Sequence, residues 1–275
     1  MLIFHPFVFC DKMSAEVKIN KKTQFMRLRQ FYLFFFNDLI WDFKLGIHTV
    51  FSDYRGMNKT NYGYDPTPYS VLQKLAKSGW LRKEDTLVDY GCGKGRVGIF
   101  LNNQIGCRVV GIDFNERRVR QSNSNLIRYY KNKNRHLHST LDKNQNDSQQ
   151  YKNKEDSALY KNQEDSPLNE NQNDFKPKIQ FIHSKAEEYV PDEANCFYFF
   201  NPFSSKIFQK VLNQIIKSND RNPRRIYIFF YYISREYRNY FPKNSDLVLV
   251  DEIDCRKSFL SSRELYKLQI YTLRQ

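Results

Sequence analysis

An acidic residue and three alternating glycines form the part of the sequence best suited to do chemistry. Residues 89–95 read D-Y-G-C-G-K-G and follow a short apolar run. Glycines at such a turn let the backbone bend sharply and approach a ligand without Cβ atoms in the way. Arg96 stands where the G-x-G-x-x-G pattern of dinucleotide sites needs its last glycine, and Asp89 would repel a pyrophosphate. The turn therefore favours a ligand with a cationic group near Asp89.

A second acid stands 24 residues further along the chain. Asp113 ends an apolar run at 107–113, which we expect to be the next strand. An acid at the end of a second strand can accept hydrogen bonds from both hydroxyls of a ribose. The two strands, the glycine turn and the terminal acid together predict a nucleoside site. The alternative is an ordinary turn followed by a helix-capping Asp113.

Apolar runs and helix-like spacings alternate along most of the chain. Near-continuous apolar strands that alternate with helices are typical of a mostly parallel sheet covered on both faces. The last two runs follow each other without a helix, so we expect an antiparallel hairpin at one side of the sheet. The expected strands cover residues 86–90, 107–113, 179–182, 196–200, 225–232, 247–253 and 265–273, and the expected helices cover 97–103, 115–130 and 204–217.

Residues 89–95 together with Asp113 resemble motifs I and II of the class I S-adenosylmethionine-dependent methyltransferases. The resemblance runs from about residue 65 to residue 273. It implies an α/β, three-layer Rossmann-like fold, in which a seven-stranded, mostly parallel sheet has helices on both faces and an antiparallel last strand. It also implies S-adenosyl-L-methionine as the cofactor, with Asp89 and Gly91 at its methionine end and Asp113 at its ribose.

The resemblance carries further cofactor contacts onto this chain. In many members an acid after the third strand meets the adenine amino group. Lys185 stands where that acid is usual, so Ala186 and Glu187 are the candidates for the adenine contact in this chain. The cofactor-binding residues that the resemblance implies are Asp89, Tyr90, Gly91, Cys92, Gly93, Gly95, Asp113, Phe114, Ala186, Glu187, Asn201 and Thr67.

A tyrosine-rich segment precedes the first expected strand. Residues 64–72 would begin a helix that covers the cofactor cleft, with Pro68 suited to its first turn. The side chains here would either line the cleft or pack the helix onto the sheet, and packing is favoured for Tyr69. The residues concerned are Tyr62, Tyr64, Thr67 and Tyr69.

The end of the fourth expected strand carries the acceptor-side hypothesis. Asn201-Pro202-Phe203 resembles the Asn-Pro-Pro-Tyr/Phe motif of methyltransferases that act on amino nitrogens. The resemblance implies that Asn201 holds the target amine while Phe203 stacks on a planar substrate, which makes Asn201, Pro202 and Phe203 the candidate catalytic residues. One proline is missing, which shifts the aromatic residue by one position. The alternative is that Asn-Pro merely ends the strand and Asn201 caps the next helix.

Aromatic and basic residues follow the fifth expected strand. They would either clamp a nucleic acid base or pack the core and its rim, and we favour packing for most of them. These residues are Tyr231, Tyr232, Tyr237, Tyr240, Arg235 and Arg238.

The positive charge belongs to the part of the chain that we expect to fold. The formal net charge is +14, and residues 135–177 contain six basic and eight acidic residues, so the remainder carries +16. This charge suggests an anionic partner such as nucleic acid, although a lysine-rich surface explains it equally well. Residues 136–176 are rich in Asn, Gln, Lys, Asp and Ser, so we expect a disordered insertion there. The expected domains are an N-terminal helical extension, 1–60, and a methyltransferase domain, 61–275, which this insertion interrupts.

The five cysteines are scattered, without the spacing of a metal site or a disulfide framework. No metal is therefore expected, and a reducing compartment, the cytoplasm, is favoured. The N-terminus lacks the features of a signal peptide, and Met13 is an alternative start. The apolar run at 31–41 contains Asp38 and is shorter than the ~20 residues that span a bilayer. We expect an amphipathic helix there and no integral membrane insertion.

Three functions remain open. The first is methylation of a base or amino group in nucleic acid, RNA before DNA, which the charge and Asn201 to Phe203 favour. The second is methylation of a small molecule or a protein side chain, which the lack of a recognisable RNA-binding appendage favours. The third is a non-catalytic module that binds S-adenosylmethionine, against which the intact glycine turn and Asp113 count. The sequence leaves the acceptor, the methylated atom and the oligomeric state open.

Overall fold

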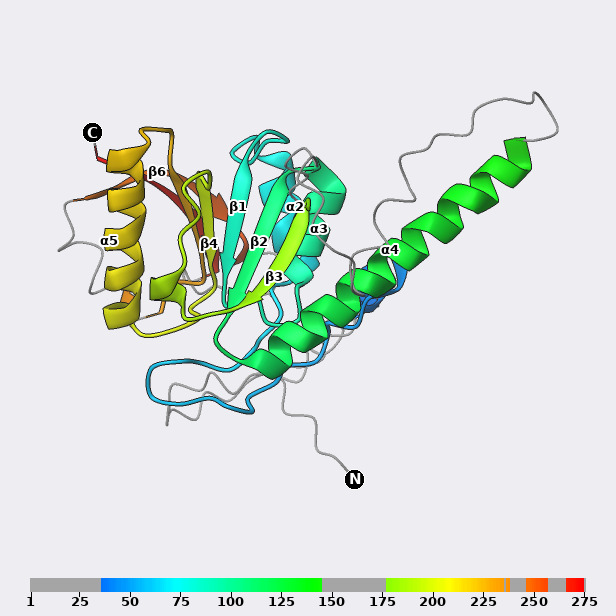
Figure 1. Cartoon of the computed structure of the whole chain (residues 1–275), viewed down its shortest axis with the longest axis horizontal. Coiled ribbons are helices and arrows are strands. Elements are labelled where there is room, and N and C mark those ends of the chain that lie inside the picture. The colour runs from blue at the N-terminus through cyan, green and yellow to red at the C-terminus, as the bar shows by residue number, and fades with distance from the viewer. Residues whose placement is uncertain (1–35, 145–176, 235, 238–245, 257–265, 275) are drawn as a thin grey trace, which may run out of the picture.

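A seven-stranded sheet in the order β3-β2-β1-β4-β5-β7-β6 forms the centre of the molecule (Figure 1). The computed structural model describes residues 36–144, 177–234, 236–237, 246–256 and 266–274, with the backbone alone for 136–144. Strands β1 to β5 pair in parallel, and β7 runs antiparallel to both of its neighbours. The predicted mostly parallel sheet with an antiparallel last strand is thereby confirmed. The strands are β1 Thr86–Tyr90, β2 Arg108–Asp113, β3 Ile179–His183, β4 Cys196–Phe199, β5 Tyr227–Tyr231, β6 Leu247–Asp254 and β7 Lys267–Leu273.

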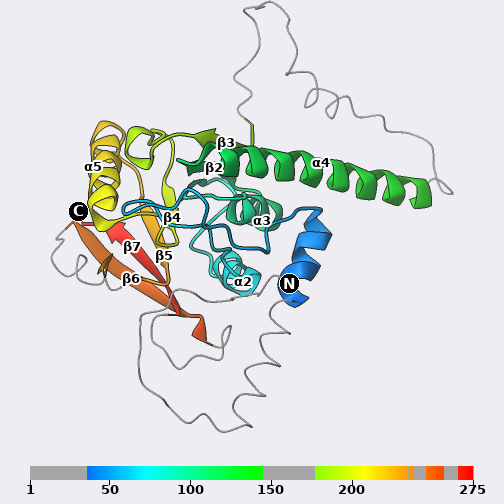
Figure 2. The same cartoon turned by 90° about the horizontal axis from the view of Figure 1, so that it is seen from below.

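Helices cover both faces of this sheet, as the alternating sequence pattern predicts (Figures 1 and 2). One face carries α2 (Tyr69–Lys77), α3 (Arg96–Ile105) and α4 (Glu116–Asn144), and the other carries α5 (Ser205–Arg221) and the short 3-10 turn η1 (Ala186–Glu188). Each face has its own buried hydrophobic cluster. The three-layer Rossmann-like architecture is thus the observed one.

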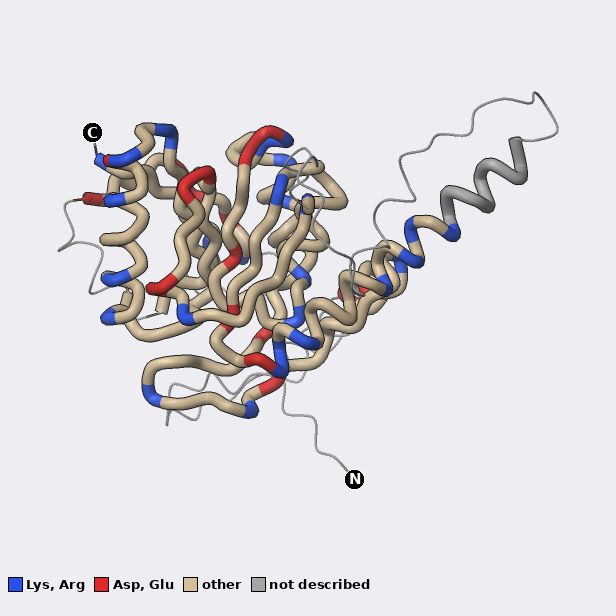
Figure 3. Tube along the Cα trace, viewed as in Figure 1, with Lys and Arg blue, Asp and Glu red and all other residues tan. Residues whose placement is uncertain are grey.

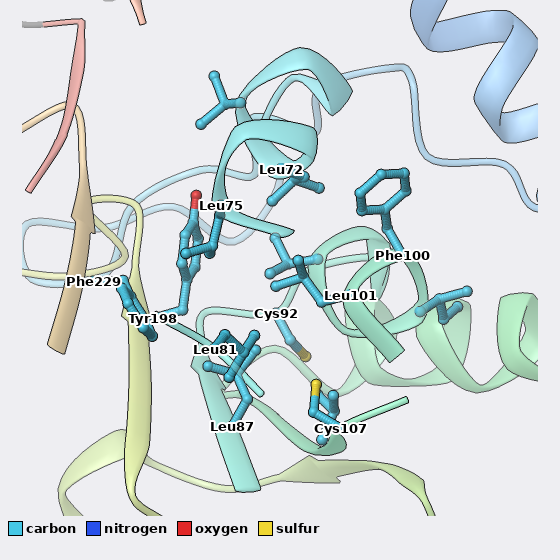
Figure 4. Close-up of a cluster of buried hydrophobic side chains, with 14 of the residues drawn as sticks. Leu72, Leu75, Leu81, Leu87, Cys92, Phe100, Leu101, Cys107, Tyr198 and Phe229 are labelled. Atoms are coloured by element: carbon cyan, nitrogen blue, oxygen red, sulfur yellow. The ribbon is translucent and has the colours of Figure 1, made fainter. Parts of the chain in front are cut away.

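The burial of β1 explains how the fold positions the site. All five residues of β1 are buried, because parallel strands in the middle of a covered sheet have no solvent face. Side chains alternate along the strand, so Leu87 packs toward α2 and α3 while Val88 and Tyr90 pack toward α5. Asp89 falls on the same face as Leu87. Figure 4 shows that face, with Tyr198 and Phe229 of the sheet near the leucines of α2 and α3.

Of the expected N-terminal helical extension, residues 1–60, the structure describes residues 36–60. Within the described part a helix covers residues 36–45, and the chain from 46 onward is largely irregular. Isolated bridges pair Asp53 with Tyr64, across the expected boundary, and Asn61 with Phe203, and the division into two domains stays a prediction. The irregular segment from residue 46 is thus held by contacts with the rest of the chain. Residues 1–35, including Met13 and the start of the 31–41 run, lie outside the described residues.

Helix α4 is longer than the sequence predicted. It continues to Asn144, past the expected end at 130 and into the segment expected to be disordered from 136. No glycine or proline stands between Glu116 and Asn144, so nothing in the sequence breaks the backbone hydrogen-bond ladder. The rest of the predicted insertion, 145–176, lies outside the described residues.

Candidate functional site

The glycine turn sits at the carboxyl end of β1 and is fixed to the end of β2. The backbone N–H groups of Gly91 and Cys92 donate to the carbonyl of Ile112 at 2.8 and 3.0 Å. Gly91 and Gly93 have φ angles of +77° and +55°, in the left-handed region that favours glycine. The turn therefore places backbone groups where the ends of the two strands meet.

The side chains of Pro202 and Tyr64 lie close to the glycines of the turn. A Cβ atom added to Gly91 would lie 2.4 Å from Cβ of Pro202, and one added to Gly93 would lie 2.0 Å from a ring carbon of Tyr64. Neither position can carry a side chain unless these neighbours move. The glycines thus let Pro202 and Tyr64 form walls beside the turn.

Asp89 is buried beside the turn with one oxygen unsatisfied. The residue is 2% exposed, and within the described residues Oδ2 has no hydrogen-bond partner. Burial, and to a smaller extent the carboxylate of Asp113, raises the pKa of Asp89 to about 8. Burying an ionised carboxylate without a partner is costly, and a bound cation would offset that cost. The site thus presents a carboxyl group suited to an ammonium group.

Asp113 is equally buried but well satisfied. Its Oδ2 accepts a hydrogen bond from the Gly93 N–H at 3.0 Å, and its Oδ1 accepts one from the Asn115 N–H at 2.8 Å. Burial raises its pKa, while these N–H donors and Arg118, 3.9 Å away, act in the opposite direction. Each carboxylate oxygen can accept a second hydrogen bond. Asp113 therefore keeps the capacity to bind hydroxyl groups.

The residues next to these two acids contribute in different ways. The ring of Tyr90 stacks on Phe199 at a centroid distance of 5.1 Å, and its hydroxyl donates to a backbone carbonyl at 3.0 Å, so this side chain belongs to the core. Cys92 is buried in the cluster under α2 and α3. The carbonyl of Phe114 lies 3.0 Å from Nε2 of His183, which links the ends of β2 and β3.

The expected adenine contacts lie after β3. Ala186 is buried and packs with the α5-side cluster. The carboxylate of Glu187 lies 3.8 Å from Nζ of Lys210, and Lys185 is exposed and pairs with Glu188 at 2.7 Å. A ligand contact by Ala186 or Glu187 stays a prediction.

Hydrogen bonds anchor Tyr64, Thr67 and Tyr69, at and before the start of α2. Thr67 Oγ1 lies 3.1 Å from the hydroxyl of Tyr198, and Tyr64 donates its hydroxyl hydrogen to the carbonyl of Thr49 at 2.9 Å. Tyr69 is fully buried and donates to Asp42 at 2.6 Å, which confirms the packing role favoured for it. Of these residues, Tyr64 is the one that lies beside the glycine turn, next to Gly93.

Two buried arginines, missed in the sequence, hold the N-terminal segment against the site. Arg96, at the start of α3, is 1% exposed and forms ion pairs with Asp38 and Asp42. Arg118, in the first turn of α4, donates to the carbonyls of Asp53, Arg55 and Tyr62 at 3.1 to 3.3 Å. The sequence did contain a signal for Arg96, because its partners Asp38 and Asp42 stand four positions apart in an otherwise largely apolar segment.

Asn201 makes contacts other than those the acceptor motif implied. Its φ is +43°, and its Nδ2 donates to the carbonyl of Tyr232 while its Oδ1 accepts from the Ser234 N–H at 3.3 Å. The residue is 6% exposed. The side-chain amide thus joins the loops after β4 and β5, and a contact of Asn201 with a target amine stays a prediction.

Phe203 lies in the core, and its predicted stacking on a substrate stays a prediction. Phe203 is 4% exposed, and its ring packs edge-on against Tyr90 and Phe199 at 6.4 and 6.1 Å. Pro202 occupies the position beside Gly91, and its carbonyl accepts from the Tyr62 N–H at 3.1 Å. With one proline fewer than the motif, the aromatic residue stands one position earlier along the chain.

Other aromatic side chains lie at the ends of β4 and β5. Phe200, Tyr232 and Tyr266 are half-buried, with Tyr232 at 6.4 Å from Phe200 and 5.2 Å from Tyr266 between ring centroids. Tyr231 and Tyr237 are buried in the core, as the packing alternative proposed. The other members of the predicted clamp, Tyr240, Arg235 and Arg238, lie outside the described residues.

Neither a metal centre nor a membrane-spanning helix is found in the described part of the chain. No group of three or more His, Cys, Asp or Glu side chains there is arranged to hold a metal ion. No helix there is long and apolar enough to cross a membrane.

Comparisons with known proteins match the part of the chain that holds the glycine turn. Residues 69–189 match a family model described as a methyltransferase domain. A 64-residue stretch is 30% identical to a protein-lysine N-methyltransferase of Saccharolobus islandicus (strain REY15A) and covers 23% of this chain and 40% of that relative. The match therefore spans less than half the length of the curated relative.

Solved structures with a similar fold include an RNA methyltransferase from Salinibacter ruber in complex with S-adenosyl-L-homocysteine, at a TM-score of 0.45 and 13% identity, over 77% of this chain and 95% of that one. Another is a SAM-dependent methyltransferase from Thiobacillus denitrificans in complex with the same compound, at a TM-score of 0.44 and 13% identity, over 86% and 97% of the two chains. The glycine turn, Asp89 and Asp113 all lie between residues 69 and 189, the part of the chain that matches the methyltransferase-domain model.

Proposed function

We propose that the protein is an S-adenosylmethionine-dependent methyltransferase that binds its cofactor at the carboxyl ends of β1 and β2. The observation that carries the proposal is Asp89, a buried carboxyl group with an unsatisfied oxygen beside a glycine turn, inside the range that matches the methyltransferase model. The four cysteines of the described residues are buried and free, which favours a reducing compartment such as the cytoplasm.

The residues present suit this cofactor. Asp89 binds the ammonium group of its methionine end, and the free lone pairs of Asp113 accept the ribose hydroxyls. Tyr64 and Pro202 form the walls beside the glycine turn. S-adenosylmethionine, when bound, supplies a methyl group on a positively charged sulfur. The protein then acts by positioning the acceptor in line with that methyl group and by excluding water.

A nucleic acid is the acceptor that the chain favours. The chain outside residues 135–177 carries a formal charge of +16. Half-buried rings of Phe200 and Tyr232 stand at the ends of β4 and β5, and β4 is the neighbour of β1, which carries Asp89. Aromatic faces can stack on a planar base, and a basic protein attracts a phosphate backbone. We place RNA before DNA, and an amino group or base nitrogen as the methylated position.

A protein lysine side chain is the second candidate. The 64-residue match to a protein-lysine N-methyltransferase favours it. The same half-buried aromatic rings would then contact the aliphatic part of the lysine and its ammonium group.

Transfer of labelled methyl groups tests the proposal. Purified protein and S-adenosylmethionine labelled in the methyl group are incubated with separated RNA, DNA, protein and metabolite pools. We expect label in RNA, loss of cofactor binding in Asp89→Ala, and a lower rate with retained cofactor binding in Asn201→Ala. Label confined to protein would establish the second candidate. No label in any pool, together with no heat of binding at millimolar S-adenosylmethionine, would refute the activity.

A further inference from the structure

Helix α4 carries a row of basic side chains along its outer face. Arg120, Arg128, Lys131 and Arg135 are all exposed. At about 100° per residue they fall within an arc of roughly 80°, on the side of the helix opposite the buried Tyr129. With a rise of about 1.5 Å per residue, the first and last are about 22 Å apart along the axis. We call these four residues the α4 stripe.

Within the described residues, few acidic groups neutralise the charges of the stripe. Glu116 is the only acidic residue from 116 to 135, and it pairs with Arg120 at 2.6 Å. Among the described residues, no ion pair engages Arg128, Lys131 or Arg135. Figure 3 shows the basic positions recurring along α4 as it leaves the body of the molecule. Like charges held close together on a rigid helix repel one another, and a bound polyanion would relieve that repulsion.

The stripe leads away from the proposed cofactor site. Asn115, which follows Asp113 by two positions, donates its N–H to Asp113 and caps α4 through Oδ1, 3.1 Å from the Arg117 nitrogen. From this cap the helix runs outward beyond the other elements (Figures 1 and 2). Anything bound along the stripe therefore lies along a path that ends at the carboxyl ends of β1 and β2.

We propose that the α4 stripe binds the sugar–phosphate backbone of a nucleic acid and guides the strand to the methyl-transfer site. The spacing of four cations over about 22 Å matches a partner with regularly repeated negative charge. An acidic protein would need apolar contact area as well, and Ile127 is the single apolar side chain exposed between the four basic ones. The link to methyl transfer rests on the proposed function, whereas the binding itself does not.

Fluorescence anisotropy with a labelled single-stranded RNA of 20 nucleotides tests the inference on the full chain. The variant Arg128→Gln/Lys131→Gln/Arg135→Gln removes three charges from the stripe. Lys133→Gln is the control for position on the helix, because Lys133 is also exposed on α4 but points about 140° or more away from the stripe. An RNA duplex and a poly-glutamate peptide serve as competitors, and titration with S-adenosylhomocysteine shows whether each variant keeps its cofactor site.

The expected result is a selective loss of salt-dependent RNA binding. Each lost phosphate contact lowers the slope of log K against log salt by about 0.7 for a single strand, so the triple variant should lose about 2 from the slope and about tenfold or more in affinity. The control should stay within about twofold. Equal RNA binding by the triple variant and the wild type would overturn the inference, as would displacement of RNA by poly-glutamate at equal charge.

The two proposals fail in different ways. Stripe-dependent RNA binding without methyl transfer to any pool would refute the proposed activity and leave the binding surface supported. Methyl transfer to RNA that is unchanged in rate and salt dependence in the triple variant would refute the stripe and leave the activity supported.

Discussion

At the scale of single residues, Asp89 and Asp113 show how similar groups acquire different roles. Both are buried carboxyl groups at the ends of neighbouring strands. Asp113 accepts hydrogen bonds from two backbone N–H groups, whereas Oδ2 of Asp89 has no partner among the described residues. The protein thus supplies a hydrogen bond to each oxygen of Asp113 and none to Oδ2 of Asp89, and the cofactor contact proposed for Asp89 rests on this difference.

Replacing Asp89 with asparagine should weaken cofactor binding. The change removes the charge that would meet the ammonium group but keeps the size of the side chain. Hydrogen bonds to charged groups contribute about 1.5–3 kcal/mol, so we expect affinity for S-adenosylhomocysteine to fall by about 10- to 100-fold in titration calorimetry. Asp220→Asn, an exposed position on α5, is the control and should bind as the wild type does. Unchanged affinity in Asp89→Asn would remove Asp89 from the site.

Phe203 and Phe200 should respond differently to the same substitution. Phe203 is in the core, so Phe203→Leu should lower the free energy of unfolding by about 1–2 kcal/mol in urea, with little effect on the Michaelis constant for the accepting pool. Phe200 is half-buried beside Tyr232, so Phe200→Leu should raise that constant and cost less stability. A rise in the Michaelis constant in Phe203→Leu alone would restore Phe203 to the acceptor side.

At the scale of elements, the sequence predicted what is encoded locally. The strand, glycine turn, helix and second strand from β1 to β2 occupy fewer than 30 consecutive residues, and their periodicity and glycines are visible without knowledge of the rest. The contacts of Asn201 were not predictable in this way, because they depend on a loop 31 to 33 residues away. Arg96 was missed for the same reason, since its partner Asp38 lies 58 positions earlier.

The element that Arg96 holds in place is the helix over residues 36–45. Arg96→Met would leave the carboxyl groups of Asp38 and Asp42 buried without their cationic partner. Breaking a buried ion pair in this way typically costs about 3–5 kcal/mol, and we expect a loss of that size in urea unfolding. Arg55→Met is the matched control, because the Arg55 side chain is 74% exposed and its pair with Asp53 should contribute less than about 1 kcal/mol. Similar losses in both variants would argue against a structural role for the buried pair.

At the scale of the whole molecule, the N-terminal segment completes the site. The family model begins at residue 69, yet Tyr64 contacts the glycine turn and the Tyr62 N–H binds the carbonyl of Pro202. Residues 46–62 have no regular apolar spacing, so their position could not be predicted from the sequence. Their position is set by Arg118 and by pairing with residues 202–204, which lie more than 50 positions away. The molecule therefore builds one site from three distant parts of the chain.

The raised pKa of Asp89 links this site to the stability of the whole chain. The pKa is about 8 in the folded protein and near its ordinary value of about 4 in the unfolded chain. Between these values the folded chain holds a proton that the unfolded chain has released. The contribution of Asp89 to the free energy of unfolding therefore falls as pH rises from about 5 to 8, by at most about 1.4 kcal/mol per pH unit.

Cofactor binding should show the opposite dependence on pH. An ammonium group stabilises the ionised carboxylate, so binding at pH 6 to 7 expels the proton of Asp89 and should tighten as pH rises toward 8, by at most about tenfold per unit. Urea unfolding at pH 6, 7 and 8 measures the first effect, and calorimetry with S-adenosylhomocysteine in buffers of different ionisation enthalpy measures the expelled proton. Other groups also titrate in this range, so the difference between the wild type and Asp89→Asn isolates Asp89. Equal pH slopes in the two proteins would show that Asp89 is already ionised in the free protein, and the site would then bind the cofactor without proton release.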